Sequence, residues 1–309
     1  MIEPCTASDR KPARRILTLD GGGIRGLFAL GILEEIETQL RQRTGRSDLV
    51  LADEFDFFAG TSTGAIIAAC LAWGMPVSEI IALYKDHGRS MFHRERVWRR
   101  LRAFYRAESL ARLFQKIFSE SDGTPATLGS SRVRTMLLVV MRNASSGSAW
   151  PVSNNPCALF NDRTSPECNL DIPIWKLLRA STAAPVYFPP ETITLGKQTH
   201  SFIDGGITPY NNPSLIAFLT ATLPEYKIDW KPGEKNLLLV SVGTGLNRAR
   251  FAPRGLIPSE KPSRLPCPGT ITGQPVSGRF APASMMRSSR RLAIHWAFWS
   301  RSAMRSCRL

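Results

Sequence analysis

Residues 55–73 restrict the fold more than any other stretch of the chain. Phe55 to Ala59 is β-prone and mostly apolar, Gly60-Thr61-Ser62-Thr63-Gly64 follows, and Ala65 to Trp73 is small and apolar. This order predicts a buried strand, a sharp turn and a buried helix packed closely on a sheet. In the turn pattern G-x-S-x-G, small neighbours allow a strained backbone that holds the serine hydroxyl out of the sheet, at the positive end of the helix. Ser62 is therefore a candidate nucleophile, and an inert serine in a structural glycine turn is the alternative.

A second glycine-rich turn precedes it. The β-prone run Ile16 to Leu19 ends in Asp20-Gly21-Gly22-Gly23-Ile24-Arg25-Gly26, and apolar residues at helical spacing follow from Leu27 to Leu40. The turn satisfies G-x-G-x-x-G, so a dinucleotide site must be considered. Two features disfavour it: Asp20 places a carboxylate beside the expected pyrophosphate, and the second strand ends in Gly60-Thr61-Ser62 rather than in an acidic residue. Consecutive glycines can instead turn their amides toward one point as an oxyanion hole, with Arg25 bracing the loop or binding a phosphate.

The general base is the next requirement of a serine nucleophile. None of the four histidines, His87, His93, His200 and His295, lies in a recognisable motif. Asp204, in Phe202-Ile203-Asp204-Gly205-Gly206, fits a carboxylate held rigidly at a strand end. Partial burial raises the proton affinity of such a carboxylate, so we expect Asp204 to hydrogen-bond directly to Ser62 and to act with it as a two-residue catalytic unit. An aspartate that only binds its own turn is the alternative.

The remaining elements indicate the fold class. Residues 134–141 and 237–242 read as strands, and Ser78 is the expected cap of a helix through Lys85. Residues 89–131 are basic and aromatic. They predict an amphipathic helical insertion whose aromatic side chains face the core, and the alternative is a mobile cover or a lipid-contacting surface over an active site. Repeated alternation of strand and helix predicts an α/β fold with a mainly parallel sheet.

Charge divides the chain unevenly. It has 309 residues and a formal net charge of +15, with 40 Lys and Arg against 25 Asp and Glu. Residues 1–247 hold 28 basic and 24 acidic residues, whereas residues 248–309 hold 12 basic residues and one acid. A nucleic-acid partner is therefore not expected for the main domain. We expect an N-terminal extension at 1–13, a folded domain at 14–247, and a disordered or atypical Pro/Ser/Arg-rich tail at 248–309 in which a membrane-surface segment is the alternative.

The cysteines and the apolar runs indicate whether a metal site, a secretion signal or a membrane span is expected. The six cysteines form no CxxC pair and show no zinc spacing, so no metal site is expected. The N-terminal residues lack the apolar core of a secretion signal, and no uninterrupted apolar run approaches the ~18 residues of a membrane span. A cytoplasmic location is the simplest expectation.

Taken together, the motifs resemble the patatin-like phospholipases over about residues 14–245. The matching pieces are Asp20 to Gly26 (D-G-G-G-x-R-G), Gly60 to Gly64 (G-x-S-x-G), Ala180 to Pro190, and Asp204-Gly205-Gly206 (D-G-G). The resemblance implies a three-layer α/β/α fold with a helical insertion, and a lipid acyl hydrolase of phospholipase A type that needs no cofactor or metal. It also implies roles for particular residues: Ser62 as nucleophile, Asp204 as base, the amides of Gly21, Gly22 and Gly23 as oxyanion hole, and Arg25, Gly60, Gly64, Gly205 and Gly206 in support.

The expected substrate is a phospholipid or another acyl lipid at a membrane surface, where the chain would act peripherally. Some bacterial relatives are phospholipase effectors switched on by cyclic nucleotides. The resemblance therefore leaves a cyclic-nucleotide activator open, but no residue of this sequence can be assigned to binding it. Family members usually continue with further helices after the region of Leu237 to Gly245, and this chain continues with the basic tail. One alternative is therefore an inactive or truncated relative that only binds lipid. A second alternative, which rests on the glycine-rich loop, is a nucleotide-binding module. The sequence does not indicate an oligomeric state.

Overall fold

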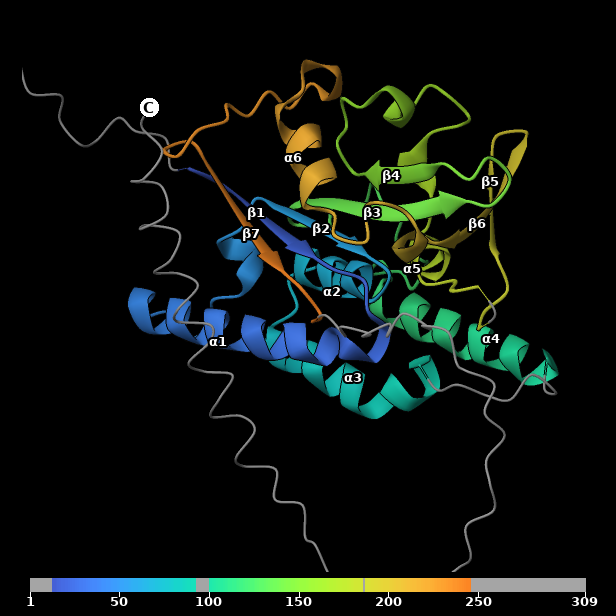
Figure 1. The fold of residues 1–309 in the computed structure, drawn as a ribbon, viewed down its shortest axis with the longest axis horizontal. Helices are drawn as coiled ribbons and strands as arrows, with labels where there is room; N and C mark the ends of the chain where they lie inside the picture. The colour runs from blue at the N-terminus through green and yellow to red at the C-terminus, as the bar shows by residue number, and fades with distance from the viewer. Residues whose placement is uncertain (1–12, 93–99, 186, 246–309) are drawn as a thin grey trace, which may run out of the picture. The chain divides into compact units, whose positions relative to one another are not determined.

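A seven-stranded sheet forms the centre of the protein (Figure 1). The computed structural model describes residues 13–92, 100–185 and 187–245, with the backbone only at 89–92, 100–107 and 109. Four neighbouring strands run parallel in the order β7 (Leu237–Val242), β1 (Arg14–Leu19), β2 (Phe57–Thr61) and β3 (Met136–Asn143). Strand β3 also pairs antiparallel with β4 (Ala149–Ser153) and β6 (Gln198–Asp204), and β6 pairs antiparallel with β5 (Glu191–Leu195). The predicted α/β class, with a mostly parallel central sheet, is confirmed.

Helices cover both faces of this sheet. They are α1 (Gly26–Thr44), α2 (Thr63–Ala72), α3 (Val77–Phe92), α4 (Arg100–Ile117), α5 (Ile174–Ser181) and α6 (Ser214–Thr222). Short 3-10 turns lie at Gly23–Arg25, Leu51–Asp53, Leu159–Asn161, Asn169–Asp171, Gly205–Ile207 and Pro224–Tyr226. Figure 1 shows α6 on one side of the sheet and α2, followed by α1 and α3, on the other. The described residues therefore form three layers.

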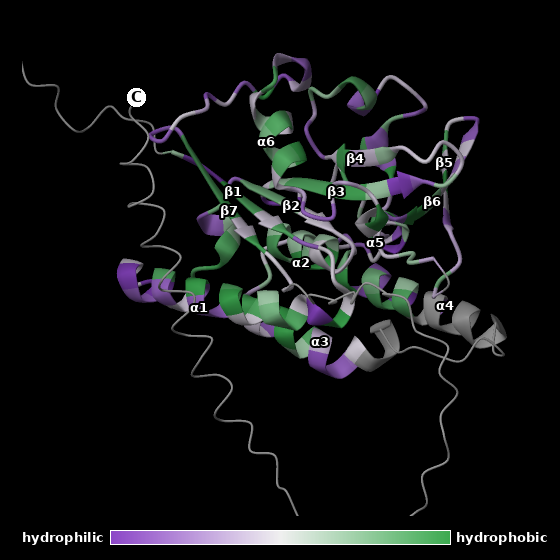
Figure 2. Ribbon diagram, viewed as in Figure 1, coloured by the Kyte–Doolittle hydropathy of each residue, from purple (hydrophilic) through white to green (hydrophobic). Residues whose placement is uncertain are grey.

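Alternation along the strands creates the two cores. Because successive strand side chains point to opposite faces, Ile16 packs with α6 residues such as Ala217, whereas Leu17 and Leu19 pack toward α2. All ten residues of α2 are buried, since α1, α3 and α5 surround the surface that the sheet leaves free. Figure 2 shows the hydrophobic residues concentrated in the strands and the hydrophilic residues on the outer parts of α1 and α3.

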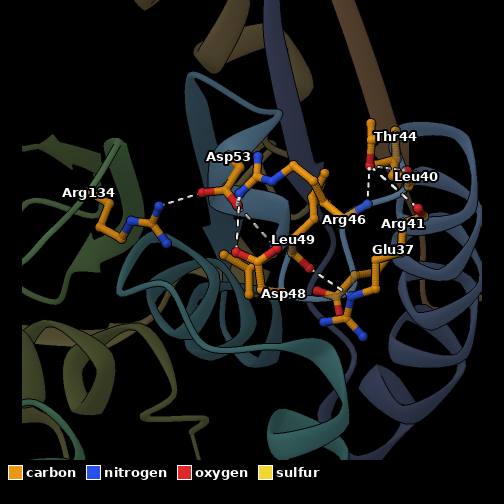
Figure 3. Close-up of polar contacts among 10 residues, drawn as sticks. Glu37, Leu40, Arg41, Thr44, Arg46, Asp48, Leu49, Asp53 and Arg134 are labelled. Carbon is orange, nitrogen blue, oxygen red and sulfur yellow. Dashed lines mark hydrogen bonds and ion pairs between the residues drawn. The ribbon is translucent and has the colours of Figure 1, made fainter.

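Polar contacts join the end of α1 to two loops that lead into strands (Figure 3). Arg46 and Arg134 both pair with Asp53, and the Arg46 Nη2 to Asp53 Oδ2 distance is 3.2 Å. Arg41 donates to the carbonyl of Leu49 at 2.8 Å. Burial alone raises the pKa of Asp53, but the Val50 amide and the two arginines outweigh it and hold this pKa below its ordinary value. Each pair is partly exposed, so each adds at most about 1 kcal/mol of stability.

Two helix boundaries differ from the sequence predictions. Helix α3 begins at Val77, not after a Ser78 cap, because the buried carboxylate of Glu37 on α1 accepts the Val77 amide hydrogen at 3.3 Å. The helix also continues past Lys85 to Phe92.

The second strand lies at Phe57–Thr61, two residues later than the run Phe55 to Ala59 suggests. The region 89–131 contributes α4, and Phe114 and Phe118 are fully buried in the core, as the core-facing alternative predicted. Among the described helices, none is long and apolar enough to cross a membrane. The tail predicted at 248–309 and most of the extension predicted at 1–13 lie outside the described residues, so both stay predictions.

Candidate active site

Strand β3 brings the two candidate residues together. On one edge, Val140 pairs with Thr61 of β2, and the next residue, Met141, pairs with Asp204 of β6. Strand β4 occupies the opposite edge of β3 over the same residues, so β2 and β6 must share one edge, end to end. Ser62 follows the last residue of β2, and Asp204 is the last residue of β6. The register therefore places both at one gap in the sheet.

Ser62 occupies a sharp turn between β2 and α2. Its backbone has φ 55° and ψ −122°, a conformation that costs a non-glycine residue about 1–3 kcal/mol. The flanking glycines permit this turn: a Cβ at Gly60 would lie 2.2 Å from the Gly64 carbonyl oxygen, and a Cβ at Gly64 would lie 2.2 Å from the Leu19 carbonyl oxygen. The Ser62 Oγ donates a hydrogen bond of 2.8 Å to Asp204 Oδ2, and both residues are buried.

Asp204 is held by its own turn. The Gly206 amide donates to Asp204 Oδ1 at 2.7 Å, which leaves Oδ2 for Ser62. Burial raises the pKa of the Asp204 carboxyl, and the hydrogen bonds from Gly206 and Ser62 oppose that shift without cancelling it. A Cβ at Gly205 would lie 2.3 Å from the Val140 carbonyl oxygen, so glycine is required where the turn leaves the sheet. The result is a rigid carboxylate with a raised proton affinity.

The loop of Gly21, Gly22 and Gly23 lies beside Ser62. A Cβ at Gly21 would be 3.3 Å from the Ser62 Cβ, and Gly23 has φ 58°, which favours glycine. The Gly21 amide donates to the Asn211 carbonyl at 3.1 Å, so its hydrogen is already engaged. Within the described part of the chain, the Gly22 and Gly23 amides donate to no protein acceptor. The loop therefore offers two amides rather than the three that the sequence suggested.

Contacts around this loop bear on the dinucleotide alternative. Thr244 donates to the Gly21 carbonyl at 2.8 Å and covers one side of Gly22, where a Cβ would lie 2.2 Å from the Thr244 Oγ1. Burial raises the pKa of Asp20 to about 6, against a weaker opposing interaction with Asn212, and Asp20 Oδ1 has no hydrogen-bond partner among the described residues. A half-buried carboxyl and a covered glycine face both disfavour the close approach of a pyrophosphate.

Arg25 braces the loop through backbone carbonyls. Its Nε donates to the Gly22 carbonyl at 3.4 Å, and its Nη1 donates to the Gly245 carbonyl at 3.2 Å. Of the two roles that the sequence left open, these contacts match bracing.

The sequence analysis assigned no role to three further residues of the site, Ser181, Asn211 and Thr244, although Ser181 lies within the matching piece Ala180 to Pro190. Ser181 Oγ accepts the Ser62 amide hydrogen at 2.9 Å. Asn211 lies between two glycine turns, since its Oδ1 is close to the Cβ positions of both Gly21 and Gly206. Their short polar side chains resemble any loop residue, so only a signal of long-range pairing could have singled them out.

Comparisons with known proteins show the family of this chain. The family profile for patatin-like phospholipase matches residues 17–218, more than half of the chain, and this range contains both Ser62 and Asp204. The chain belongs to the patatin-like phospholipase family. It is 30% identical over 252 residues to Patatin group J-1 of Solanum tuberosum, covering 75% of this chain and 60% of that protein. It is 29% identical over 250 residues to Patatin-2-Kuras 4 of the same species, covering 75% and 62%.

This patatin-like chain thus spans about 60% of the length of the curated relatives that it matches. Two solved structures are similar at low identity. VipD from Legionella pneumophila is 15% identical with a TM-score of 0.40, covering 78% of this chain and 64% of that chain. The type III effector protein ExoU is 16% identical with a TM-score of 0.32, covering 56% and 40%.

Proposed function

We propose that this chain is a lipid acyl hydrolase of phospholipase A type, which cleaves ester-linked fatty acids from membrane lipids through a Ser62–Asp204 dyad. The observation that carries the proposal is the 2.8 Å hydrogen bond from Ser62 Oγ to Asp204 Oδ2 in a strained strand-to-helix turn. A buried hydroxyl bonded to a buried carboxylate forms a nucleophile with its base in contact. The chain would act peripherally at a membrane surface, because its substrates reside there.

The reaction then follows from the contacts of each group. Ser62 Oγ attacks the ester carbonyl, and its proton passes to Asp204 Oδ2, whose raised proton affinity favours the transfer. The amides of Gly22 and Gly23, together with the positive end of α2, stabilise the oxyanion of the tetrahedral intermediate.

Asp204 returns its proton to the departing alkoxide, which leaves as a lysolipid, and the fatty acyl group stays bonded to Ser62. Water then loses a proton to Asp204, attacks the acyl-enzyme, and releases the fatty acid as Ser62 recovers its proton. These steps use only groups of the protein and water.

Removal of the base tests the dyad. Asp204→Asn keeps the shape and a hydrogen-bonding side chain but cannot accept the Ser62 proton, so fatty-acid release from phosphatidylcholine vesicles should fall by about 10²–10⁴-fold. Asp171→Asn is the matched control, because Asp171 is largely exposed and its ion pair with Arg163 is 3.8 Å long. Full activity in Asp204→Asn would remove Asp204 from the mechanism. Vesicle binding by the wild type without any fatty-acid release would favour the alternative of a relative that only binds lipid.

A further inference from the structure

Ser181 holds the backbone of the candidate nucleophile. It is the last residue of α5, it is fully buried, and its Oγ accepts the amide hydrogen of Ser62 at 2.9 Å. The same hydroxyl donates to the Val140 carbonyl of β3 at 2.6 Å. The Ser181 hydroxyl therefore acts as acceptor and as donor at one place, the point where Ser62 leaves the sheet beside Val140. The two serines are 119 positions apart in the sequence.

The position of this hydroxyl explains why the junction needs it. The pairing of β2 with β3 ends at Thr61 and Val140, and the turn at Ser62 then leaves the sheet. The Ser181 hydroxyl enters where the ladder stops, and it bridges the Ser62 amide on one strand to the Val140 carbonyl on the other. Without it, the buried Ser62 amide and the buried Val140 carbonyl would both lose this partner, next to a residue whose backbone has a positive φ.

The chain just after Ser181 holds the other member of the dyad. Two residues later, the Ala183 carbonyl accepts the amide hydrogen of Asp204 at 3.0 Å. One short segment thus contacts the backbones of both Ser62 and Asp204, whose side chains meet at 2.8 Å. A shift of this segment would change the separation of the nucleophile from its base.

We propose that Ser181 is a positioning residue for the hydrolytic reaction, acting through the Ser62 backbone to set the Ser62–Asp204 geometry. This inference rests on the proposed function, because it assumes that Ser62 is the nucleophile. Misplacement of a reacting group by about 1 Å can lower a rate by about 100-fold. Loss of the hydroxyl should therefore lower kcat while KM stays nearly constant, since Ser181 is fully buried and leaves no surface for a substrate to contact.

The test follows the rate at which a fluorophosphonate labels Ser62, alongside kcat and KM for a short-chain p-nitrophenyl ester. Ser181→Ala should lower the labelling rate and kcat by at least about tenfold, with KM changed less than about twofold. Ser181→Thr keeps a hydroxyl and should retain most of the wild-type rate. Ser181→Cys is nearly isosteric with serine but carries a thiol, which forms weaker hydrogen bonds, so its labelling rate should lie between those of Ser181→Ala and the wild type. Thr222→Val is the matched control, because Thr222 lies at the end of α6, away from the 181–183 segment, and its hydroxyl donates to a carbonyl of its own helix, that of Phe218, at 2.8 Å.

Equal labelling rates in Ser181→Ala and Thr222→Val would overturn the positioning role. If Ser181→Ala does not fold, the Ser181→Cys variant decides instead, and a wild-type labelling rate in it would have the same meaning. A wild type that is labelled at Ser62 but releases no fatty acid from vesicles would refute the lipid substrate alone, and the labelling rates would still judge Ser181. Absence of any labelling at Ser62 would refute both proposals.

Discussion

The close approach of α2 to β1 makes Gly64→Ala the sharpest structural perturbation of the site. A Cβ at Gly64 would lie 2.2 Å from the Leu19 carbonyl oxygen and 2.7 Å from that of Asp20, and ordinary contacts begin at 3.4 Å. Both atoms belong to the backbone, so no side chain can rotate away. Helix α2 and strand β1 would have to separate by about 1 Å, which displaces Ser62 and the glycine loop together.

The magnitude follows from this overlap. Overpacking a rigid core costs about 1–3 kcal/mol, and the backbone on both sides places Gly64→Ala at the upper end. For a domain of this size, about 3 kcal/mol lowers the melting midpoint by roughly 6–12 °C. The same 1 Å displacement should lower kcat for a short-chain ester by about 100-fold in the protein that remains folded.

Gly31→Ala supplies the matched control within the same protein. Gly31 lies in α1, and a Cβ there meets nothing within 4 Å, so this alanine should raise stability by about 0.5–1 kcal/mol and leave kcat unchanged. Circular-dichroism melts and initial rates on both variants provide the comparison. A Gly64→Ala variant with the wild-type midpoint and the wild-type kcat would refute the inference that this glycine sets the geometry of the turn.

Three further outcomes are expected. Because the pKa of Asp204 is raised and its base form must be ionised, kcat/KM should fall on the acid side at a pH above the ordinary range of an aspartate, as a pH–rate profile would show; a limb within that ordinary range would contradict it. The pKa of Asp20 is raised from 3.8 to about 6 in the folded chain, so the wild type loses stability as the pH rises from the first value through the second. Asp20→Asn should therefore melt higher than the wild type at about pH 8 and lose that advantage at about pH 4. A difference in melting midpoint that is the same at both pH values would contradict the raised pKa. Glu37→Ala leaves the Val77 amide without its carboxylate and should lower the free energy of unfolding by about 1–3 kcal/mol in chemical denaturation, whereas an unchanged value would show that another acceptor replaces it.

Local sequence signals predicted the units that are built from neighbouring residues. The runs before Asp20 and before Ser62 became β1 and β2, and the apolar patterns after them became α1 and α2, because strand, glycine turn and helix leave period and composition signals within about 20 residues. Strand β7 has the predicted bounds, Leu237–Val242. The strand end predicted at Asp204 is the end of β6, but the antiparallel strands β4 and β5 were not predicted, since they are short and partly exposed.

The features of the site that the sequence patterns could not predict depend on contacts between residues far apart in the sequence. The meeting of Ser62 with Asp204 depends on the register of β3 with both β2 and β6, which no local motif encodes. The Gly21 amide is engaged by Asn211, and three consecutive glycines do not reveal which amide a distant carbonyl occupies. The start of α3 at Val77 likewise depends on Glu37, 40 residues away. In each case the partner lies in a different element, so its contribution appears only in the folded chain.

The most direct measurement is fatty-acid release from phosphatidylcholine vesicles by the wild-type chain and by Ser62→Ala, at equal concentrations of folded protein. If Ser62 is the nucleophile, the wild type should release fatty acid and lysolipid in equal amounts, and Ser62→Ala should lower the rate by about 1,000-fold or more. Its melting midpoint should stay close to that of the wild type, because among the described residues the lost hydroxyl hydrogen-bonds to Asp204 alone. A folded Ser62→Ala variant that releases fatty acid at the wild-type rate would contradict the assignment of Ser62.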